Sequence, residues 1–328
     1  MQTIALAPTT IETSRLGFGC ARLLRTPTRK ERQALLGAAF ENGIRHFDVA
    51  RMYGLGTAES ELGRFARGRR DEVVLATKFG IEPSGATGAL ARLQAPARRA
   101  IRRFPALRPL ARRTSGGLYE PRRYDADSAR ASLETSLREL GTDHLDLVFL
   151  HEPGPRDAVD AEGVAGYLEQ ARAAGWIGAW GVSGDPGDSL AIAALFERPP
   201  DVLQLREHVL APAPPVAPGA QARITFGALS TATDAVLRHV RAGDAAAKRW
   251  QEATGVSCTD ASAVASLLLR WALRANPDGV VLFSTTRSDR IAAAVADAAA
   301  VDGGRADPAL DALEVLVERE LRAVPASL

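Results

Sequence analysis

Cysteine, lysine and aromatic residues are scarce in this chain of 328 residues. The two cysteines, Cys20 and Cys258, lie far apart and form no metal-ligand spacing, so we expect buried, reduced thiols rather than a disulfide scaffold. The only lysines are Lys30, Lys78 and Lys248, so arginine supplies nearly all of the positive charge. With 46% hydrophobic and 24% charged residues, the composition excludes collagen-like, mucin-like and wholly disordered chains.

Long apolar runs are also absent from the sequence. No uncharged apolar run approaches the roughly 18 residues that a membrane-spanning helix needs. The first residues, MQTIALAPTT, lack the basic and apolar regions of a secretory signal peptide. We therefore expect a cytoplasmic protein with no membrane partner. The 41 basic and 39 acidic residues give a formal net charge of +2, which does not point to nucleic acid.

Short, continuously apolar segments alternate with longer segments of helical periodicity along most of the chain. Continuously apolar strands are typical of a parallel sheet that is covered by helices. Eight strand–helix units predict one α/β domain over residues 1–328, a (β/α)8 TIM barrel rather than a doubly wound sheet. Residues 3–14 are expected to form a hairpin that closes the bottom of the barrel. The expected strands are Arg15–Gly19, Arg45–Val49, Val73–Thr77, Leu145–Leu150, Ile177–Val182, Val202–Leu205, Ile224–Leu229 and Val280–Phe283.

Two segments depart from this alternation. Residues 207–222 stand where the sixth helix belongs but are rich in proline, so we expect that helix to be missing or very short. Residues 81–124 form a long insertion after the third strand. Between Arg92 and Arg123 there are ten arginines and one acidic residue, Glu120, a local charge of +9 that leaves −7 on the remaining chain.

The basic insertion has three interpretations. We favour a solvated loop or lid, because long loops at this end of a barrel commonly carry function. Alternatively, its field attracts an anionic substrate or the phosphates of a cofactor. Nucleic acid or an acidic protein is the least favoured partner, since the arginine-rich stretch RRAIRRFPALRPLARR contains one aromatic residue, Phe104, for stacking on bases. The prolines Pro105 and Pro109 weigh against a helix lying on a membrane surface.

Rare polar residues stand at the carboxyl ends of three consecutive strands, where barrel enzymes build their active sites. Asp48 ends the second strand and Tyr53 follows it closely in the sequence. Lys78 ends the third strand, and His151 ends the fourth. An apolar strand that runs into a charged side chain is energetically costly unless the charge has a partner. The four residues therefore predict one catalytic cluster.

This cluster suits the protonation of a carbonyl oxygen. A tyrosine phenol has an ordinary pKa of about 10, and we expect the Lys78 ammonium to lower the pKa of Tyr53 and so assist proton donation. Asp48 would hold Lys78, and His151 would orient the substrate carbonyl through a hydrogen bond. Reduction of a carbonyl also needs a hydride, which indicates a nicotinamide cofactor.

At these positions the sequence resembles the aldo-keto reductase superfamily, from about residue 14 to residue 296. The resemblance implies a (β/α)8 barrel that binds NAD(P)H in an extended form without a Rossmann motif, and no GxGxxG follows a strand here. It assigns the catalytic tetrad to Asp48, Tyr53, Lys78 and His151. It rests on the segments FDVARMYGLGTAESELGRFARGRRDEVVLATKFG, ASLETSLRELGTDHLDLVFLHEP, GWIGAWGVSG, DVLQL and VVLFSTTRSDRI.

The same resemblance implies which residues bind the cofactor. Ser183, Gly184 and Gln204 would hold the nicotinamide carboxamide, although the family usually has Asn in place of Gly184. Phe226 would stack on the nicotinamide where the family usually has Tyr, and Leu229 would lie at the pyrophosphate. Arginines near the adenosine 2′-phosphate favour NADP(H) over NAD(H). The remaining implied cofactor residues are Cys20 and, around the 2′-phosphate, Ser284, Thr285, Arg287 and Arg290.

The expected function is NAD(P)H-dependent reduction of an aldehyde, ketone or sugar-like carbonyl to an alcohol, or the reverse reaction, with Tyr53 as the proton donor. Two alternatives stay open. The departures from the family pattern at Gly184 and Phe226 suit a cofactor-binding regulatory subunit with little turnover. The pair of Tyr53 and Lys78 would equally serve a non-redox biosynthetic reaction, such as a dehydration or an isomerisation.

Overall fold

Eight parallel strands close into a barrel in the part of the chain that the computed structural model describes, residues 1–84, 118–215, 221–302 and 306–322. They pair in the order β10-β3-β4-β5-β6-β7-β8-β9, so the last strand of the sequence closes the barrel against the first. The predicted (β/α)8 barrel is therefore confirmed. The strands are β3 (Leu16–Gly19), β4 (His46–Asp48), β5 (Val74–Phe79), β6 (Leu145–His151), β7 (Ile177–Gly184), β8 (Val202–Arg206), β9 (Ala222–Phe226) and β10 (Val280–Phe283).

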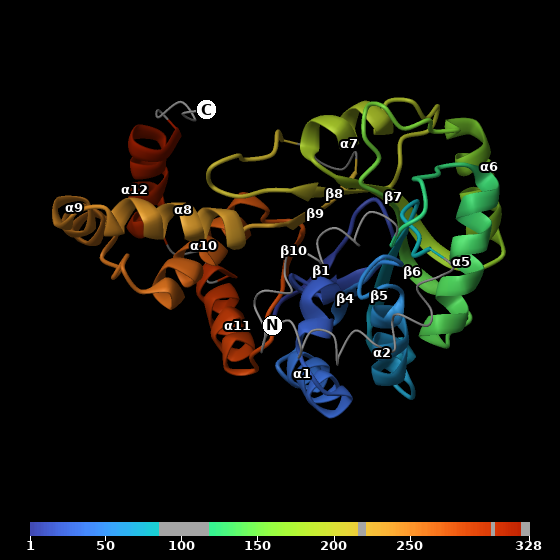
Figure 1. Cartoon of the computed structure of the whole chain (residues 1–328), viewed down its shortest axis with the longest axis horizontal. Helices are drawn as coiled ribbons and strands as arrows, with labels where there is room; N and C mark the ends of the chain where they lie inside the picture. Colours follow the sequence, from blue (N-terminus) through green and yellow to red (C-terminus); the bar gives the residue numbers. More distant parts are fainter. Residues whose placement is uncertain (85–117, 216–220, 303–305, 323–328) are drawn as a thin grey trace.

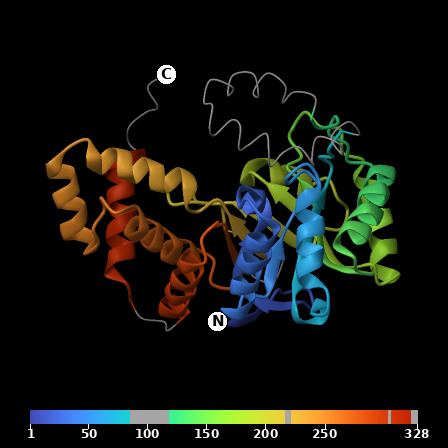
Figure 2. The same ribbon diagram turned by 60° about the horizontal axis from the view of Figure 1, so that its bottom comes forward.

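Helices cover the outside of the barrel (Figure 1). Figures 1 and 2 show that α8 to α12 gather on the side of β9 and β10, away from α5 and α6. The helices are α1 (Arg29–Glu41), α2 (Thr57–Ala66), α5 (Ala126–Leu140), α6 (Ala161–Ala173), α7 (Pro186–Ala193), α8 (Ser230–Arg241), α9 (Asp244–Thr254), α10 (Ala261–Ala275), α11 (Asp289–Asp302) and α12 (Pro308–Val317). Short 3-10 helices span Cys20–Arg25 and Arg70–Glu72, and a π-helical turn spans Glu318–Arg322.

Local sequence signals determine where the helices begin and end. Thr28 and Glu31 form a capping box at the start of α1, each side chain bonding the other residue's backbone N–H. The chain leaves α1 through Gly43, whose φ of +86° suits glycine. Asp125 caps α5 by accepting a hydrogen bond from the backbone N–H of Ser128 at 2.7 Å.

The N-terminal hairpin closes the amino end of the barrel, as predicted. Its strands are β1 (Thr3–Ala5) and β2 (Glu12–Ser14), which pair antiparallel. Leu6, in the connection between them, is fully buried. It packs against inward-facing residues near the starts of the barrel strands, such as Val202 and Val280. The hairpin therefore shields this end of the apolar interior from water.

The end of β9 differs most from the prediction, by three residues, whereas the other boundaries of the barrel strands lie within two residues of it. β9 ends at Phe226 rather than at Leu229, because Gly227 takes a φ of +86° and turns the chain out of the sheet. Leu229 instead immediately precedes α8. Within the described residues 207–215 and 221 there is no helix, in agreement with the prediction for the proline-rich segment.

Only the two ends of the basic insertion, residues 81–84 and 118–124, lie within the described residues. They meet in an antiparallel bridge between Pro83 and Tyr119. The stretch from Arg92 to Arg113, which holds most of the arginines of the insertion, lies outside the described residues. In the ranges that are described, no helix combines the length and apolarity needed to cross a membrane.

Side-chain alternation determines which residues face the barrel interior. Residues two positions apart on a strand point to the same face. On β5, Ala76 belongs to the apolar cluster inside the barrel, so Lys78 faces inward as well. On β6, Phe149 belongs to the same cluster, and His151 follows it with the same orientation. The last inward position of each strand thus lies in one layer at the carboxyl end of the barrel.

Candidate active site

A polar layer lies above the apolar interior of the barrel, at the carboxyl ends of the strands. Strand register places His151 beside Ser183, and Ser183 beside Gln204. Asp48 pairs with Gly19 on the other side of the barrel. The layer thus brings most of the predicted catalytic and nicotinamide-binding residues together. Its members, in barrel order, are Gly19, Asp48, Lys78, His151, Ser183, Gln204, Phe226 and Ser284.

Asp48 connects the predicted catalytic residues to the predicted cofactor residues. Its Oδ1 accepts a hydrogen bond from Lys78 Nζ at 2.5 Å, and its Oδ2 accepts one from Gln204 Nε2 at 2.7 Å. Lys78 Nζ also donates to the carbonyl oxygen of Val49 at 3.0 Å. All three side chains are buried. Removing one partner of a buried ion pair typically costs about 3–5 kcal/mol, so Asp48 holds Lys78 firmly in place.

Tyr53 completes the predicted tetrad from the loop between β4 and α2. Its backbone N–H donates to the Ala50 carbonyl oxygen at 3.0 Å, which fixes the turn. The Tyr53 ring lies edge-on to the His151 ring, with centroids 5.7 Å apart. Lys78 Nζ lies 5.4 Å from the centroid of the same ring. Among the described residues, the Tyr53 hydroxyl has no hydrogen-bond partner, so it is available to a ligand.

The pKa of Tyr53 is raised rather than lowered, and the prediction from the sequence is wrong on this point. Burial raises the pKa of Tyr53 well above its ordinary value, and the carboxylates of Asp48 and Glu152 raise it further. The guanidinium of Arg206 lowers this pKa in turn, but it does not offset burial and the two carboxylates. Tyr53 is consequently a protonated phenol at neutral pH, which is the form that a proton donor requires.

His151 is a neutral imidazole. Burial lowers the pKa of His151 well below its ordinary value, and the positive charges of Lys78 and Arg122 lower it further. The hydroxyl of Tyr124 donates a hydrogen bond to the His151 carbonyl oxygen at 2.6 Å. A Cβ at Gly80 would lie 2.1 Å from the Tyr124 ring, so glycine allows this ring its position. Tyr124 was not predicted, and the scarcity of tyrosine was the one available signal.

A second buried network, which sequence analysis also missed, supports the same loop and strand. Glu59 on α2 is fully buried and forms an ion pair with Arg51, two residues before Tyr53. Glu59 Oε1 also accepts a hydrogen bond from Thr77, the neighbour of Lys78, at 2.7 Å. The signal for this network in the sequence was Glu59, a charged residue on the apolar side of α2. The network connects the segments that carry Tyr53 and Lys78.

The residues predicted to hold a nicotinamide carboxamide lie together beside Asp48. Ser183 Oγ donates to Gln204 Oε1 at 2.5 Å, and both side chains are buried. Gly184 follows Ser183 at the end of β7. Phe226 is the residue predicted to stack on the nicotinamide. The guanidinium of Arg206 lies over its ring, 5.0 Å from the ring centroid. This contact with Arg206 was not predicted.

The residues predicted for the adenosine half of the cofactor follow β10. Ser284 Oγ donates to the Gly19 carbonyl oxygen at 2.7 Å, and Thr285 Oγ1 accepts from the backbone N–H of Arg287 at 3.1 Å. Arg287 is paired through two nitrogens with Asp289. Arg290 is exposed and forms no ion pair with a described residue.

Cys20 lies at the edge of the polar layer, at the start of a 3-10 helix. It is fully buried, and burial raises the pKa of its thiol, with the Asp48 carboxylate acting in the same direction. The thiol therefore stays protonated and unreactive. Cys258 is likewise a buried, free cysteine, as predicted.

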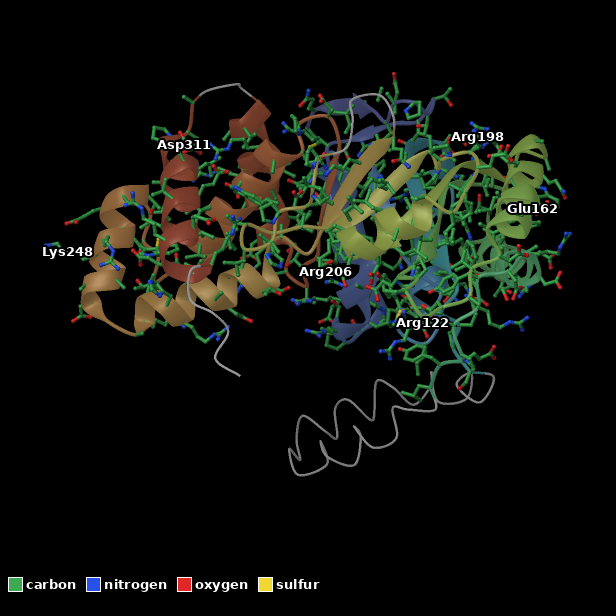
Figure 3. The ribbon with its side chains drawn as sticks, turned by 90° about the horizontal axis from the view of Figure 1, so that it is seen from above. Arg122, Glu162, Arg198, Arg206, Lys248 and Asp311 are labelled. Carbon is green, nitrogen blue, oxygen red and sulfur yellow. The ribbon has the colours of Figure 1, made fainter. Side chains whose placement is uncertain are left out.

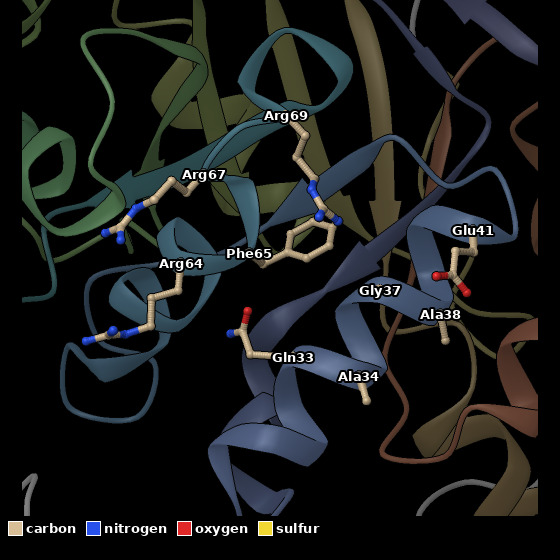
Figure 4. Close-up of a pocket in the computed structure, with 9 residues that line it drawn as sticks. All are labelled: Gln33, Ala34, Gly37, Ala38, Glu41, Arg64, Phe65, Arg67 and Arg69. Atoms are coloured by element: carbon tan, nitrogen blue, oxygen red, sulfur yellow. The ribbon is translucent and has the colours of Figure 1, made fainter.

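Two surface cavities lie beside α1, away from the tetrad. The first, of about 470 Å³, lies between α1 and α2, and Figure 4 shows Arg69 over Phe65 at its upper side. The second, of about 660 Å³, lies between α1 and the loop before α11 and includes Arg287 in its lining. Neither cavity is lined by a tetrad residue, so the first has no part in the predicted chemistry, whereas the second adjoins the predicted 2′-phosphate site.

Comparison with known proteins gives the family of the chain. A family model described as aldo/keto reductase family matches residues 15–301. The chain is 34% identical over 190 residues to a D-threo-aldose 1-dehydrogenase of Pseudomonas sp., a match that covers 54% of this chain and 52% of that protein. It is 33% identical over 190 residues to a 6-dehydroglucose reductase of Agrobacterium fabrum, covering 56% of this chain and 54% of that protein. The match thus spans about half the length of these curated relatives.

Solved structures of low sequence identity share the barrel. A glycerol dehydrogenase of Gluconobacter oxydans has a TM-score of 0.71 at 18% identity, covering 99% of this chain and 98% of that chain. An aldo-keto reductase from Bacillus halodurans has a TM-score of 0.68 at 18% identity, covering 100% of this chain and 99% of that chain. These likenesses show the fold alone. The family match extends over residues 15–301 and includes all four tetrad positions, and this chain therefore belongs to the aldo/keto reductase family.

Proposed function

We propose that this protein is an NADP(H)-dependent oxidoreductase that interconverts a carbonyl compound and its alcohol, with Tyr53 as the proton donor. The observation that carries the proposal is the packing of Lys78 and His151 against the Tyr53 ring, at 5.4 Å and 5.7 Å from its centroid. The phenol hydroxyl is left without a partner among the described residues. Membership of an oxidoreductase family supports the same reaction class.

In this mechanism each residue has one task. Tyr53 donates its proton to the carbonyl oxygen, and the Lys78 ammonium stabilises the phenolate that remains. Neutral His151 donates a hydrogen bond that orients the same oxygen. Asp48 keeps Lys78 charged and in place through the 2.5 Å ion pair. When bound, the reduced nicotinamide supplies the hydride for the carbonyl carbon.

The side chains present fit a nicotinamide dinucleotide phosphate. Ser183 and Gln204 offer hydrogen-bonding groups at the polar layer, and Phe226 offers a ring face. At Gly19 a Cβ would come within 2.7 Å of Ser284 Oγ, so glycine allows this hydroxyl its place at the rim. The guanidinium of Arg290, which forms no ion pair with a described residue, suits a 2′-phosphate, and this supports NADP(H) over NAD(H).

We infer that the substrate is a hydrophilic aldehyde, ketone or sugar-like carbonyl. The rim around the polar layer carries charged side chains, among them Glu152, Asp185 and Arg206. Charged and hydrogen-bonding groups of this kind suit a hydroxyl-bearing substrate better than a fully apolar one. The names of two relatives, a D-threo-aldose 1-dehydrogenase and a 6-dehydroglucose reductase, support sugars as the first compounds to test.

The test is NADPH oxidation by the purified protein with a panel of aldehydes, ketones and aldoses, compared with Tyr53→Phe. General acid catalysis is commonly worth about 10²–10⁴-fold, so we expect Tyr53→Phe to lower kcat at least about hundredfold while NADPH still binds. Tyr167→Phe, a tyrosine of α6 remote from the tetrad, is the matched control and is expected to keep full activity.

Other outcomes would replace the proposal by one of the alternatives. Equal rates for the wild type and Tyr53→Phe would remove Tyr53 from the mechanism. NADPH binding with no turnover of any carbonyl would favour a regulatory subunit. Conversion of substrate without NADPH oxidation would favour a non-redox reaction that uses the same pair of residues.

A further inference from the structure

The backbone of Glu152, directly after the predicted catalytic His151, adopts an unusual conformation. Its φ is +49°, a region that residues other than glycine rarely occupy. The Glu152 N–H donates to the Ser183 carbonyl oxygen at 2.6 Å, and Arg122 donates to the Glu152 carbonyl oxygen at 2.7 Å. Strained residues that their neighbours hold in place occur most often at functional sites. The backbone geometry thus directs attention to the Glu152 side chain.

The neighbouring Gly184 leaves room for Glu152. A Cβ at Gly184 would lie 3.4 Å from Glu152 Cα and 4.0 Å from Glu152 Cγ. It would also lie 3.0 Å from Ser189 Oγ, which is tighter than ordinary contact. Glu152 therefore stands on the side of Gly184 toward which a side chain at this position would project.

The Glu152 carboxylate is held at the rim by one guanidinium. Its Oε1 accepts a hydrogen bond from Arg206 at 3.3 Å, and Arg206 Nε donates to Asp185 at 2.6 Å. Arg206 also lies over the Phe226 ring (5.0 Å to the centroid), and Figure 3 shows Arg206 and Arg122 along the same edge of the barrel. The second oxygen, Oε2, is bonded to no described residue. Glu152, next to Gly184, therefore offers an acceptor that the described residues do not use.

The groups already assigned to the carboxamide provide one acceptor that is not yet used. Ser183 donates its hydroxyl hydrogen to Gln204 Oε1 and keeps its own oxygen as an acceptor, whereas Gln204 Oε1 already accepts from Ser183 and one Gln204 N–H is committed to Asp48. A carboxamide brings two N–H donors, which need acceptors. We propose that the Glu152 carboxylate accepts a hydrogen bond from the nicotinamide carboxamide, in place of the side chain that Gly184 lacks. The inference rests on the proposed function, because it requires a nicotinamide beside Ser183.

The experiment compares two dinucleotides that differ only in these N–H groups. Dissociation constants for NADP+ and for its 3-acetylpyridine analogue, in which a methyl group replaces the amide nitrogen, are measured by calorimetry for the wild type and variants. The positive charge of the ring is the same in both ligands, so the ratio of the two constants isolates the hydrogen bond. For Glu152→Ala we expect the preference for NADP+ to fall about tenfold, the usual worth of a hydrogen bond to a charged group.

Further variants separate the role of the carboxylate from a general disturbance of the rim. Glu152→Gln keeps an acceptor oxygen and is expected to retain part of the preference. In Glu152→Ala the space beside position 184 opens, and adding Gly184→Asn is expected to restore discrimination. Glu162→Gln, an exposed glutamate of α6, is the control and should leave the ratio unchanged.

The outcomes distinguish this inference from the proposed function. An unchanged ratio in Glu152→Ala, with both dinucleotides still bound, would overturn the role of Glu152 and leave the proposed function intact. A wild-type protein that binds neither dinucleotide would overturn the proposed function itself.

Discussion

His46 is the most isolated polar residue of the barrel interior. It lies two positions before Asp48 on β4 and therefore faces inward, one layer below the polar layer. It is fully buried, and neither ring nitrogen has a hydrogen-bond partner among the described residues. Burial lowers the pKa of His46 to about 4, from an ordinary value of 6.5. The folded protein thus contains a neutral imidazole that the unfolded chain would protonate in weak acid.

This difference predicts a loss of stability in weak acid. Between pH 6.5 and pH 4 the unfolded state binds a proton at His46 that the folded state does not, so the free energy of unfolding falls as the pH falls. The shift corresponds to about 3 kcal/mol. Urea unfolding at pH 7, 6, 5 and 4 would measure it against His46→Leu, which cannot titrate. Parallel curves for the two proteins would contradict the prediction.

Residues of the site divide into those that the sequence could reveal and those that it could not. Asp48, Lys78 and His151 stand out because each is a polar residue at the carboxyl end of a strand. Glu152 has a positive φ, and Tyr124 forms a hydrogen bond across the barrel rim. Neither property depends on a local pattern, since each follows from how distant segments meet. The raised pKa of Tyr53 was missed for the same reason, because it depends on burial and on the nearby carboxylates of Asp48 and Glu152.

At the scale of secondary-structure elements, one glycine sets the distance between α2 and α5. A Cβ at Gly63 of α2 would lie 2.3 Å from the carbonyl oxygen of Leu140, the last residue of α5. Backbone atoms cannot move aside as a flexible side chain can. Gly37 in the middle of α1 is different, because nothing lies within 4 Å of a Cβ built there.

The two glycines therefore predict opposite responses to alanine. Gly63→Ala forces α2 away from α5 and is expected to lower the free energy of unfolding by about 1–3 kcal/mol. Gly37→Ala removes a conformationally flexible residue from α1 and is expected to raise the free energy of unfolding by about 0.5–1 kcal/mol. Chemical denaturation of both variants measures the pair. Equal effects at the two positions would show that helix propensity, not contact, governs Gly63.

The order and type of the barrel strands followed from the sequence, whereas the end of β9 did not. Continuous apolar strands and helical periodicity are local properties, so they identified the strands and the (β/α)8 architecture. The end of β9 depended on the conformation of Gly227, and a glycine within a short apolar run does not by itself indicate a turn. The proline-rich segment after β8 was easier to interpret, because proline cannot donate the backbone hydrogen bonds of a helix.

At the scale of the whole molecule, the proposed cofactor site extends from β7 to the start of α11. Ser183 and Gln204 belong to the polar layer, whereas Arg290 stands in the first turn of α11, beyond β10. In the proposed site, the adenosine end of the cofactor would therefore be recognised by a part of the protein that takes no role in the chemistry. Cofactor preference and catalysis are separable in this arrangement.

Arg290→Ala is expected to weaken NADPH binding about ten- to hundredfold and to leave NADH binding unchanged, because an arginine–phosphate contact is lost. Arg287→Ala is the matched comparison. Its guanidinium is engaged by Asp289, so a smaller effect is expected. Fluorescence titration with both cofactors gives the four dissociation constants that are needed. An equal loss for NADH and NADPH in Arg290→Ala would exclude a specific role in 2′-phosphate recognition.

The double engagement of Asp48 has a consequence for how this protein can evolve or be redesigned. The Asp48 carboxylate accepts hydrogen bonds from both the Lys78 ammonium and the Gln204 amide. In the proposed mechanism, proton delivery and nicotinamide binding would therefore share a residue, and substitutions on the two sides would not be independent of each other. Selection for a new cofactor at Gln204 will alter the environment of the proton donor as well. Compensating pairs of mutations, rather than single steps, are the accessible route at this position.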